Sequence, residues 1–479
     1  MTDTTVDQVD AIARAAKDAF ALVSKTDDTT RAAWLRGVAD AIDADAAGLI
    51  ELAAAETALP ASPRLGGELA RTTAQLRLFA KVIEEGSYLE ATIDHPDATA
   101  TPPIPDLRRV LRPIGPVAVF AASNFPFAFS VAGGDTASAL AVGCPVVVKA
   151  HPGHPETSRR MAAVVAEALA AAGAPEGTFA LIEGFEAGLA LVDHPAIRAV
   201  GFTGSVRGGR ALLDRAAARP EPIPFYGELG SLNPVVITPG ADAARGGALA
   251  EGLAGSFQLG AGQFCTKPGV VLVPEGSAVE SALPGLLAPQ SRLLTEAISA
   301  GFSSGVDRVS GVPGVEVVAG DAAPDGTAPL VAATTAANLL EHADELLEEV
   351  FGPFTLLVRY RDEAERDAVI AALPGNLTAT VHHEESEDVE GLVGTLEGLA
   401  GRVLFAGWPT GVAVSWAQHH GGPWPSTNAN FTSVGATAVR RFQRPVAYQD
   451  APASLLPAAL REDNPLGIPR RVDGVLVLP

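Results

Sequence analysis

Apolar residues recur at three- and four-residue spacing through residues 7–85, and this pattern predicts amphipathic helices there. A proline-rich stretch at 101–105 interrupts the pattern. From about residue 112, short β-branched runs predict buried strands that alternate with helices. The expected strands are 117–120, 146–148, 179–182 and 197–202, and the expected helices lie near 130–142, 157–172, 186–193 and 206–217.

Strands that alternate with helices of this length favour an α/β fold built on a parallel sheet with both faces covered. Such a sheet binds ligands at the carboxyl ends of its strands. Asn124, Lys149 and Ser205 all follow expected strands. The second half, from about Gly230, again mixes helices and strands, and its Gly/Ser/Pro-rich region 299–330 predicts loops.

The chain's length and charge exclude several classes of protein. A chain of 479 residues is too long for one hydrophobic core, so two or three domains are expected. The formal charge of −22 disfavours binding to nucleic acid or to anionic membranes. No secretory signal is visible, and the apolar runs fall short of the roughly 20 residues that a membrane helix needs. We therefore expect a cytoplasmic protein.

Two cysteines are too few for a disulfide framework in a chain of this length. Cys144 fits the commoner reading of a lone cysteine, a small buried apolar residue, whereas Cys265 lies in a glycine-rich loop and is a candidate nucleophile. Glu228 is either a satisfied structural carboxylate or a proton acceptor with a raised pKa. His419 and His420 are either bases or structural residues, and no histidine spacing suggests a metal site.

Six motifs together carry a family pattern. In chain order they are Ser123-Asn124-Phe125-Pro126, Val148-Lys149-Ala150-His151-Pro152, Gly201-Phe202-Thr203-Gly204-Ser205, Glu228-Leu229-Gly230-Ser231-Leu232-Asn233-Pro234, Gly262-Gln263-Phe264-Cys265-Thr266 and Glu348-Glu349-Val350-Phe351-Gly352-Pro353. With these motifs the chain resembles the aldehyde dehydrogenase superfamily. Segments 71–77, 151–154, 265–269, 420–423, 444–450 and 464–468 resemble its NADP-type and α-ketoglutaric semialdehyde (2,5-dioxovalerate) dehydrogenases.

The resemblance implies an NAD(P)-dependent oxidation of an aldehyde to a carboxylate, with three catalytic residues. The Cys265 thiolate would attack the carbonyl to form a thiohemiacetal. The Asn124 amide and the Cys265 backbone N–H would hold the oxyanion. Loss of hydride to the nicotinamide would leave a thioester, and Glu228 would activate the water that hydrolyses it.

The resemblance also assigns the cofactor site. Lys149 would contact the adenosine ribose, and Glu349 the nicotinamide ribose. NAD-preferring relatives often place an acidic residue where this chain has Pro152, so we expect NADP or NAD, with a preference for NADP. One feature opposes this preference: some NADP-using relatives have an arginine in the loop that begins at Gly184, and this chain has none there. The remaining expected cofactor residues are Gly184, Gly188, Ser205, Phe351, Phe120 and Ser123.

The implied fold is aldehyde dehydrogenase-like, with three parts. A Rossmann-type parallel-sheet cofactor domain would span 1–229, with 98–112 contributing to oligomerisation. An α/β catalytic domain would span 230–430, and a C-terminal segment with an oligomerisation strand would span 431–479. Members of the family form dimers or tetramers, so a homodimer or homotetramer is expected, with Val475 to Leu478 extending a partner's sheet.

The substrate is expected to be a small aldehyde, and α-ketoglutaric semialdehyde, which would yield 2-oxoglutarate, is the resemblance's suggestion. Arg71 or Arg77 could hold its far carboxylate, or either could be a solvated helix residue. Trp416, Trp424 and Phe264 could line an apolar tunnel. Two alternatives are a CoA-acylating enzyme, which would not need Glu228, and a catalytically silent relative with a structural or binding role.

Overall fold

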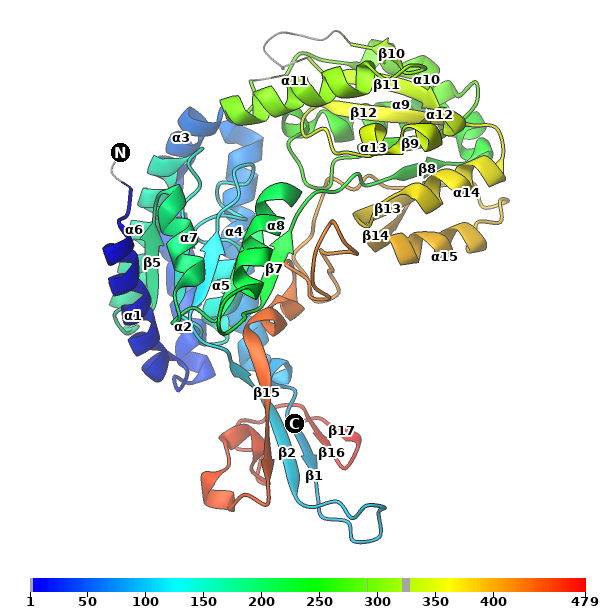
Figure 1. Cartoon of the computed structure of the whole chain (residues 1–479). Coiled ribbons are helices and arrows are strands. Elements are labelled where there is room, and N and C mark those ends of the chain that lie inside the picture. The colour runs from blue at the N-terminus through cyan, green and yellow to red at the C-terminus, as the bar shows by residue number, and fades with distance from the viewer. Residues whose placement is uncertain (1–2, 291, 321–327) are drawn as a thin grey trace.

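The structure is a computed structural model, and it describes residues 3–290, 292–320 and 328–479. Its strands form three sheets of five, seven and five strands. Figure 1 shows two α/β bodies side by side, with the third sheet projecting beneath them. No helix within the described ranges combines the length and the apolar character needed to span a bilayer.

The first body is built on a fully parallel sheet with the order β5-β4-β3-β6-β7. The strands are β3 (Val117–Phe120), β4 (Val146–Lys149), β5 (Phe179–Ile182), β6 (Ala199–Thr203) and β7 (Phe225–Glu228). The helices between them are α5 (Gly134–Ala141), α6 (Pro155–Ala171), α7 (Phe185–Asp193) and α8 (Val206–Ala217). These elements confirm the alternating pattern and the parallel sheet predicted from the sequence. The strand order reverses at β3, and the crevice of a doubly wound sheet opens at such a point.

Four helices precede this sheet, as the helical period over 7–85 predicts. They are α1 (Val6–Val23), α2 (Asp28–Ala44), α3 (Ala46–Thr57) and α4 (Gly66–Glu85). Apolar side chains of α2 and α4, among them Trp34, Ile42, Leu76 and Phe79, share one buried cluster with the first sheet. This burial supplies most of the stabilisation that fixes α4, which carries its polar residues toward the active site.

The second body contains a seven-stranded sheet with the order β10-β11-β12-β9-β8-β13-β14. All its pairs are parallel except that of the edge strand β10. The strands are β8 (Val235–Ile237), β9 (Val270–Pro274), β10 (Glu316–Ala319), β11 (Leu330–Thr335), β12 (Phe354–Tyr360), β13 (Asn376–His382) and β14 (Ala400–Phe405). The helices are α9 (Pro239–Phe257), α10 (Ala278–Ala282), α11 (Glu296–Ser310), α12 (Ala336–Glu341), α13 (Ala343–Leu346), α14 (Glu363–Ala372) and α15 (Glu390–Leu399).

The prediction of loops over 299–330 is wrong for most of that region. Helix α11 runs through Ser310, and β10 follows it. The helix buries Phe302, Val306 and Val309, whose spacing gives one apolar face. Glycine and serine content hid that face, because tertiary packing outweighs the weak helix propensity of those residues. Residues 321–327 lie outside the described residues.

The third sheet joins distant segments in the order β15-β2-β1-β16-β17. Its strands are β1 (Thr92–Asp94), β2 (Leu107–Pro113), β15 (Gln443–Gln449), β16 (Arg470–Val472) and β17 (Val475–Val477). Every residue of β17 is exposed at the sheet's edge. Its backbone therefore presents unpaired groups to which another strand can add.

A buried ion pair fastens the C-terminal segment to the first body. Arg441, only 2% exposed, donates to the Asp135 carboxylate at the start of α5 with a 2.6 Å N···O distance. We expect Arg441→Met to lower the free energy of unfolding by about 3–5 kcal/mol, because Asp135 is left without its partner. Arg440→Met, which removes only the half-exposed pair with Glu90, should cost about 0–1 kcal/mol in the same urea titration. Equal losses in the two variants would contradict this assignment.

Candidate active site

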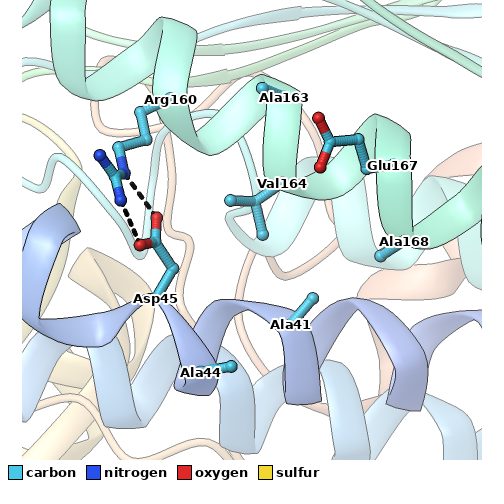
Figure 2. A pocket seen from close by; sticks show the side chains of 8 residues that line it. All are labelled: Ala41, Ala44, Asp45, Arg160, Ala163, Val164, Glu167 and Ala168. Atoms are coloured by element: carbon cyan, nitrogen blue, oxygen red, sulfur yellow. Dashed lines mark hydrogen bonds and ion pairs between the residues drawn. The ribbon is translucent and has the colours of Figure 1, made fainter.

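Two cavities differ in chemistry. One, of about 550 Å³, lies between α2 and α6. Figure 2 shows that Arg160 and Asp45, which lie at one side of it, form an ion pair. Its other lining residues are alanines, Val164 and Glu167, so it holds no nucleophile. The second, of about 420 Å³, is lined by Cys265 together with Pro60, Pro63, Arg64, Gly67, Glu68, Arg71, Phe125, Phe129, Leu259, Gly260, Phe264, Thr266, Thr410, Gly411 and Val412. The second cavity is therefore the candidate active site.

Cys265 lies in the turn between α9 and β9 and is half-buried. The turn needs glycine: Gly262 has a φ of +67°, and a Cβ there would lie 2.2 Å from the carbonyl oxygen of Gly352. The Cys265 Sγ lies 3.7 Å from the Nε2 of His420. Burial raises the pKa of the Cys265 thiol to about 12, and the charges of Glu228 and Glu349 add to the rise. At neutral pH the thiol is thus protonated unless a base removes its proton.

Glu228 is the last residue of β7 and lies near the same nitrogen of His420. Its Oε2 is 3.8 Å from His420 Nε2, and this buried oxygen has no hydrogen-bond partner among the described residues. Burial raises the pKa of the Glu228 carboxyl well above its usual range, although Arg441 opposes the rise. A carboxylate with a raised pKa and a free oxygen is a competent proton acceptor.

His420 is the site residue whose role the sequence left open. The N–H of Leu229, the residue after β7, donates to the Ser426 carbonyl (2.8 Å). This bond ties the loop that contains His420 and Ser426 to the end of β7. Burial lowers the pKa of His420 to about 3, helped by the charges of Arg402 and Arg71. The imidazole is therefore neutral, and the same nitrogen, Nε2, faces both the thiol and Glu228. No local sequence signal marks this role, because the contact joins positions 155 residues apart.

Asn124 is buried in the loop after β3, beside the nucleophile's turn. Its Nδ2 donates to the carbonyl of Gln263 (3.1 Å), which leaves the second amide hydrogen available. The backbone carbonyl of Asn124 accepts a hydrogen bond from the Arg64 guanidinium (2.9 Å). Arg64 in turn pairs with Glu68, whose Oε1 accepts from the backbone N–H groups of Phe127 and Ala128. This network holds the loop, and with it the amide, in one place.

Two arginines near Cys265 retain unused donors, Arg71 in the cavity lining and Arg402 outside it. The Nη1 and Nη2 atoms of Arg71 are buried without a partner among the described residues, and its Nε donates to the Val412 carbonyl (3.3 Å). Arg402 donates to the carbonyls of Gly411 and Pro409 but has a buried, unpartnered Nε. Burial lowers the pKa of Arg71, and the charges of Glu68 and Cys265 oppose this. Of the two readings left open for Arg77, the structure supports a surface helix residue, since Asp40 and Asp43 pair with it there.

The expected aromatic tunnel is only partly present. Phe264 lines the cavity and packs edge-to-face with Phe125, with ring centroids 5.1 Å apart. Trp416 and Trp424 are not among the lining residues and are exposed. In the described part of the chain, no group of three or more His, Cys, Asp or Glu residues could hold a metal ion.

The expected cofactor residues lie at the carboxyl edge of the first sheet. Lys149 ends β4, Phe120 ends β3, and Gly188 of α7 packs against both. A Cβ on Gly188 would lie 3.1 Å from the Phe120 ring and 3.4 Å from the Lys149 side chain. Burial lowers the pKa of Lys149, and the negative charges of Asp3 and then Glu183 oppose this. Half-buried Ser123 follows in the loop after β3.

Two helix N-termini face the same edge. Gly184, with a φ of +102°, precedes α7, and exposed Ser205 caps α8 by accepting from the Gly208 N–H (3.2 Å). Such termini bind phosphate groups, so the residues present fit a dinucleotide. Glu349 and Phe351 come from the second body and are half-buried. Burial raises the pKa of Glu349 to about 7, although Lys267 opposes the rise.

Comparison with known proteins gives one consistent result. Residues 1–292 match the aldehyde dehydrogenase family. The chain is 48% identical to alpha-ketoglutaric semialdehyde dehydrogenase 2 of Azospirillum brasilense, over 96% of this chain and 90% of that protein. It is 43% identical to alpha-ketoglutaric semialdehyde dehydrogenase of Acinetobacter baylyi, over 98% and 92%.

Solved structures share the fold. Proline Utilization A of Bradyrhizobium japonicum superposes with a TM-score of 0.80 at 25% identity, over 94% of this chain, and the chain spans 45% of that protein. A 1-pyrroline-5-carboxylate dehydrogenase from Thermus with bound NAD superposes with a TM-score of 0.79 at 20% identity, over 93% of this chain and 86% of that one. The aldehyde dehydrogenase-like α/β fold expected from the sequence is confirmed.

The 3.7 Å contact supports Cys265 as a reactive thiol and His420 as its base. We expect iodoacetamide to alkylate half-buried Cys265 and to spare Cys144, which is fully buried and donates to the Phe442 carbonyl. Because the thiolate reacts and the pKa is raised, the rate should still climb at pH 9 instead of levelling near the ordinary cysteine pKa of about 8.5. His420→Asn should slow alkylation at pH 7.5 by at least about tenfold.

The control for this measurement is His419→Asn, since His419 is adjacent but makes no contact with the Cys265 thiol. Peptide mass spectrometry identifies the alkylated cysteine at each time point. Equal rates in the wild type and in His420→Asn, or alkylation of Cys144 before Cys265, would contradict the assignment.

Proposed function

The chain belongs to the aldehyde dehydrogenase family, and we propose that it oxidises α-ketoglutaric semialdehyde to 2-oxoglutarate with a nicotinamide cofactor. One observation carries the proposal: the reactive thiol Cys265 and the buried, unpartnered nitrogens of Arg71 share a cavity. A thiol acts on a carbonyl carbon, and a guanidinium binds a carboxylate. The two relatives reported above are named for a substrate that contains both groups.

The first step requires a thiolate at Cys265. In neutral His420 a proton on Nδ1 leaves the Nε2 lone pair free to accept the thiol proton across 3.7 Å. His420 keeps that proton until the second step returns it to the departing sulfur, and Glu228, 3.8 Å from the same nitrogen, stays free to accept the water proton. The sulfur attacks the aldehyde carbon, and the free N–H of the Asn124 amide and the Cys265 backbone N–H hold the oxyanion.

The second step forms the acid. A nicotinamide cofactor held by Lys149 and Glu349 would supply the acceptor for the hydride that the thiohemiacetal must lose. The remaining thioester on Cys265 is cleaved by water, and Glu228 takes the proton from this water as the carbon–sulfur bond breaks. One aldehyde, one water and one oxidised cofactor thus give one carboxylate, one reduced cofactor and protons. Glu228 is the residue that directs the acyl group to water instead of CoA.

Substrate specificity follows from charge around the cavity. A buried guanidinium with two unsatisfied nitrogens is costly until an anion binds to it. Arg71 faces the Phe129 ring, with its guanidinium carbon 5.3 Å from the ring centroid, so its plane is held beside the cavity. Glu68, the nearest acid on the same helix, is already engaged by Arg64 and the backbone. The far carboxylate of the substrate would complete the set of donors on Arg71.

The preferred cofactor and the assembly are further parts of the proposal. Pro152 leaves Lys149 without a neighbouring carboxylate on its own loop, which favours NADP. The acidic groups Asp3 and Glu183 act against it. The exposed edge strand β17 supports a homodimer or homotetramer in which β17 pairs with a second copy.

The test of the reaction is a steady-state assay with α-ketoglutaric semialdehyde, succinic semialdehyde and pentanal, each with NAD and with NADP. We expect the highest kcat/KM for α-ketoglutaric semialdehyde. Absence of reduced cofactor with all three aldehydes would overturn the proposed reaction, and a preference for pentanal would overturn the proposed substrate.

Variants of α4 test the role of Arg71. Arg71→Gln should lower kcat/KM for α-ketoglutaric semialdehyde by about 100-fold, because a charged hydrogen-bonding partner of the carboxylate is lost. Its kcat/KM for pentanal should change little, which also shows that the variant is folded. Arg77→Gln on the same helix is the matched control and should behave as the wild type with both aldehydes. Equal losses on both aldehydes in Arg71→Gln would contradict carboxylate recognition.

A further inference from the structure

The N-terminal segment crosses the cofactor edge of the first sheet. The Thr4 N–H donates to the Glu183 carbonyl (3.0 Å), and the Glu183 N–H donates to the Thr4 hydroxyl oxygen (2.9 Å). Thr5 then begins α1 with a capping box shared with Gln8. These bonds fix the backbone on both sides of the Thr4 peptide, so the position of the preceding residue, Asp3, is set by structure.

Asp3 places its carboxylate at the start of α7. A Cβ on Gly184 would lie 2.7 Å from Asp3 Cγ and 2.8 Å from Asp3 Oδ2, so only a glycine leaves room for the acid. Asp3 is also the largest negative influence on the pKa of Lys149, ahead of Glu183. The acid therefore contacts the position of Gly184 and lies close enough to Lys149 for its charge to act there.

The charge of Asp3 is not neutralised by a cation of its own. Glu183, the second acid of this edge, is held by Arg159 through two bonds of 2.7 and 2.6 Å. Asp3 is exposed, and the described residues include no ion pair to it. The carboxylate that remains available beside Lys149 is therefore that of Asp3.

We propose that Asp3 is a specificity-determining residue that selects NAD over NADP. This inference rests on the proposed use of a nicotinamide dinucleotide whose adenosine ribose lies against Lys149. A carboxylate there accepts hydrogen bonds from the ribose hydroxyls and repels a 2′-phosphate. Because position 152 is a proline, the loop after β4 offers no carboxylate to the ribose, and Asp3 offers one from the N-terminal segment. The preference for NADP expected from Pro152 alone is thereby reversed.

Binding of the reduced cofactors tests the proposal without relying on turnover. The full-length protein, with any affinity tag at the C-terminus, is titrated with NADH and with NADPH by fluorescence or calorimetry. We expect wild-type protein to bind NADH more tightly, and Asp3→Asn to shift the ratio of the two Kd values toward NADPH by about tenfold, which corresponds to loss of one close like-charge repulsion. Raising the salt concentration should shrink the wild-type ratio, because these charges are exposed.

Asp7→Asn is the matched control, since Asp7 is an exposed acid in the first turn of α1. It should leave the ratio unchanged. Thr4→Val, which removes the hydroxyl acceptor that tethers the segment, should shift the ratio in the same direction as Asp3→Asn. An unchanged ratio in Asp3→Asn, or an equal shift in Asp7→Asn, overturns the proposal.

The outcome separates this proposal from that on function. If the ratio shifts as expected while no aldehyde is oxidised, the role of Asp3 stands and the proposed reaction fails. If aldehyde oxidation is normal and the ratio of the two Kd values is unchanged in Asp3→Asn, the reaction stands and the role of Asp3 fails. If the wild-type chain binds neither cofactor, both fail.

Discussion

The reaction that we propose depends on a thiolate at Cys265, where the surroundings oppose one. Burial and two neighbouring carboxyls raise the pKa of Cys265 to about 12, so the free thiol is unreactive at neutral pH. His420, kept neutral by burial and by nearby arginines, offers a lone pair at 3.7 Å. We propose Glu228, whose buried Oε2 has no partner among the described residues, as the acceptor of the water proton. The pKa shifts of Cys265 and His420 both oppose transfer of the proton between them, so the contact brings the two groups together at an energetic cost.

The fold is what brings these groups together. Glu228 ends a strand of the first sheet, Cys265 lies in a turn of the second body, and His420 comes from the loop that returns between them. In Figure 1, β7 lies on the side of the first body that faces the second. Asn124 follows β3 and Lys149 ends β4, and the carboxyl ends of these strands share one edge. The parallel arrangement therefore places the residues that we propose as oxyanion donor, base and cofactor ligands at a single junction.

The sequence predicted four of the five strands of the first sheet, and the clearest, β3 and β4, are short valine-rich runs that are almost wholly buried. It missed β7, whose four residues include no β-branched side chain. It failed where the signal is weak or distant. Helix α11 was hidden by its glycine and serine content. Arg71 and Arg77 could not be told apart, because they differ only in whether acids on a neighbouring helix, Asp40 and Asp43, reach them.

The residues of the candidate site likewise divide into those that the sequence predicted and those that it could not. Cys144 fits the buried reading that its sequence context favoured. The motifs marked the positions of Cys265, Glu228 and Asn124, but adjacent histidines in a glycine-rich loop gave no sign of which would face the thiol. Asp3 could not have been placed beside Lys149 from sequence, because only folding of α1 against the first sheet brings them together.

In the reaction that we propose, Cys265 carries the acyl group and Glu228 promotes its release to water. The most direct measurement mixes Glu228→Gln with excess aldehyde and cofactor, quenches with acid, and records the intact protein mass. We predict one equivalent of reduced cofactor per site in a rapid burst, followed by slow turnover, with an acyl adduct on the Cys265 peptide. Sustained turnover at the wild-type rate without an adduct, or an adduct on another residue, would contradict the account.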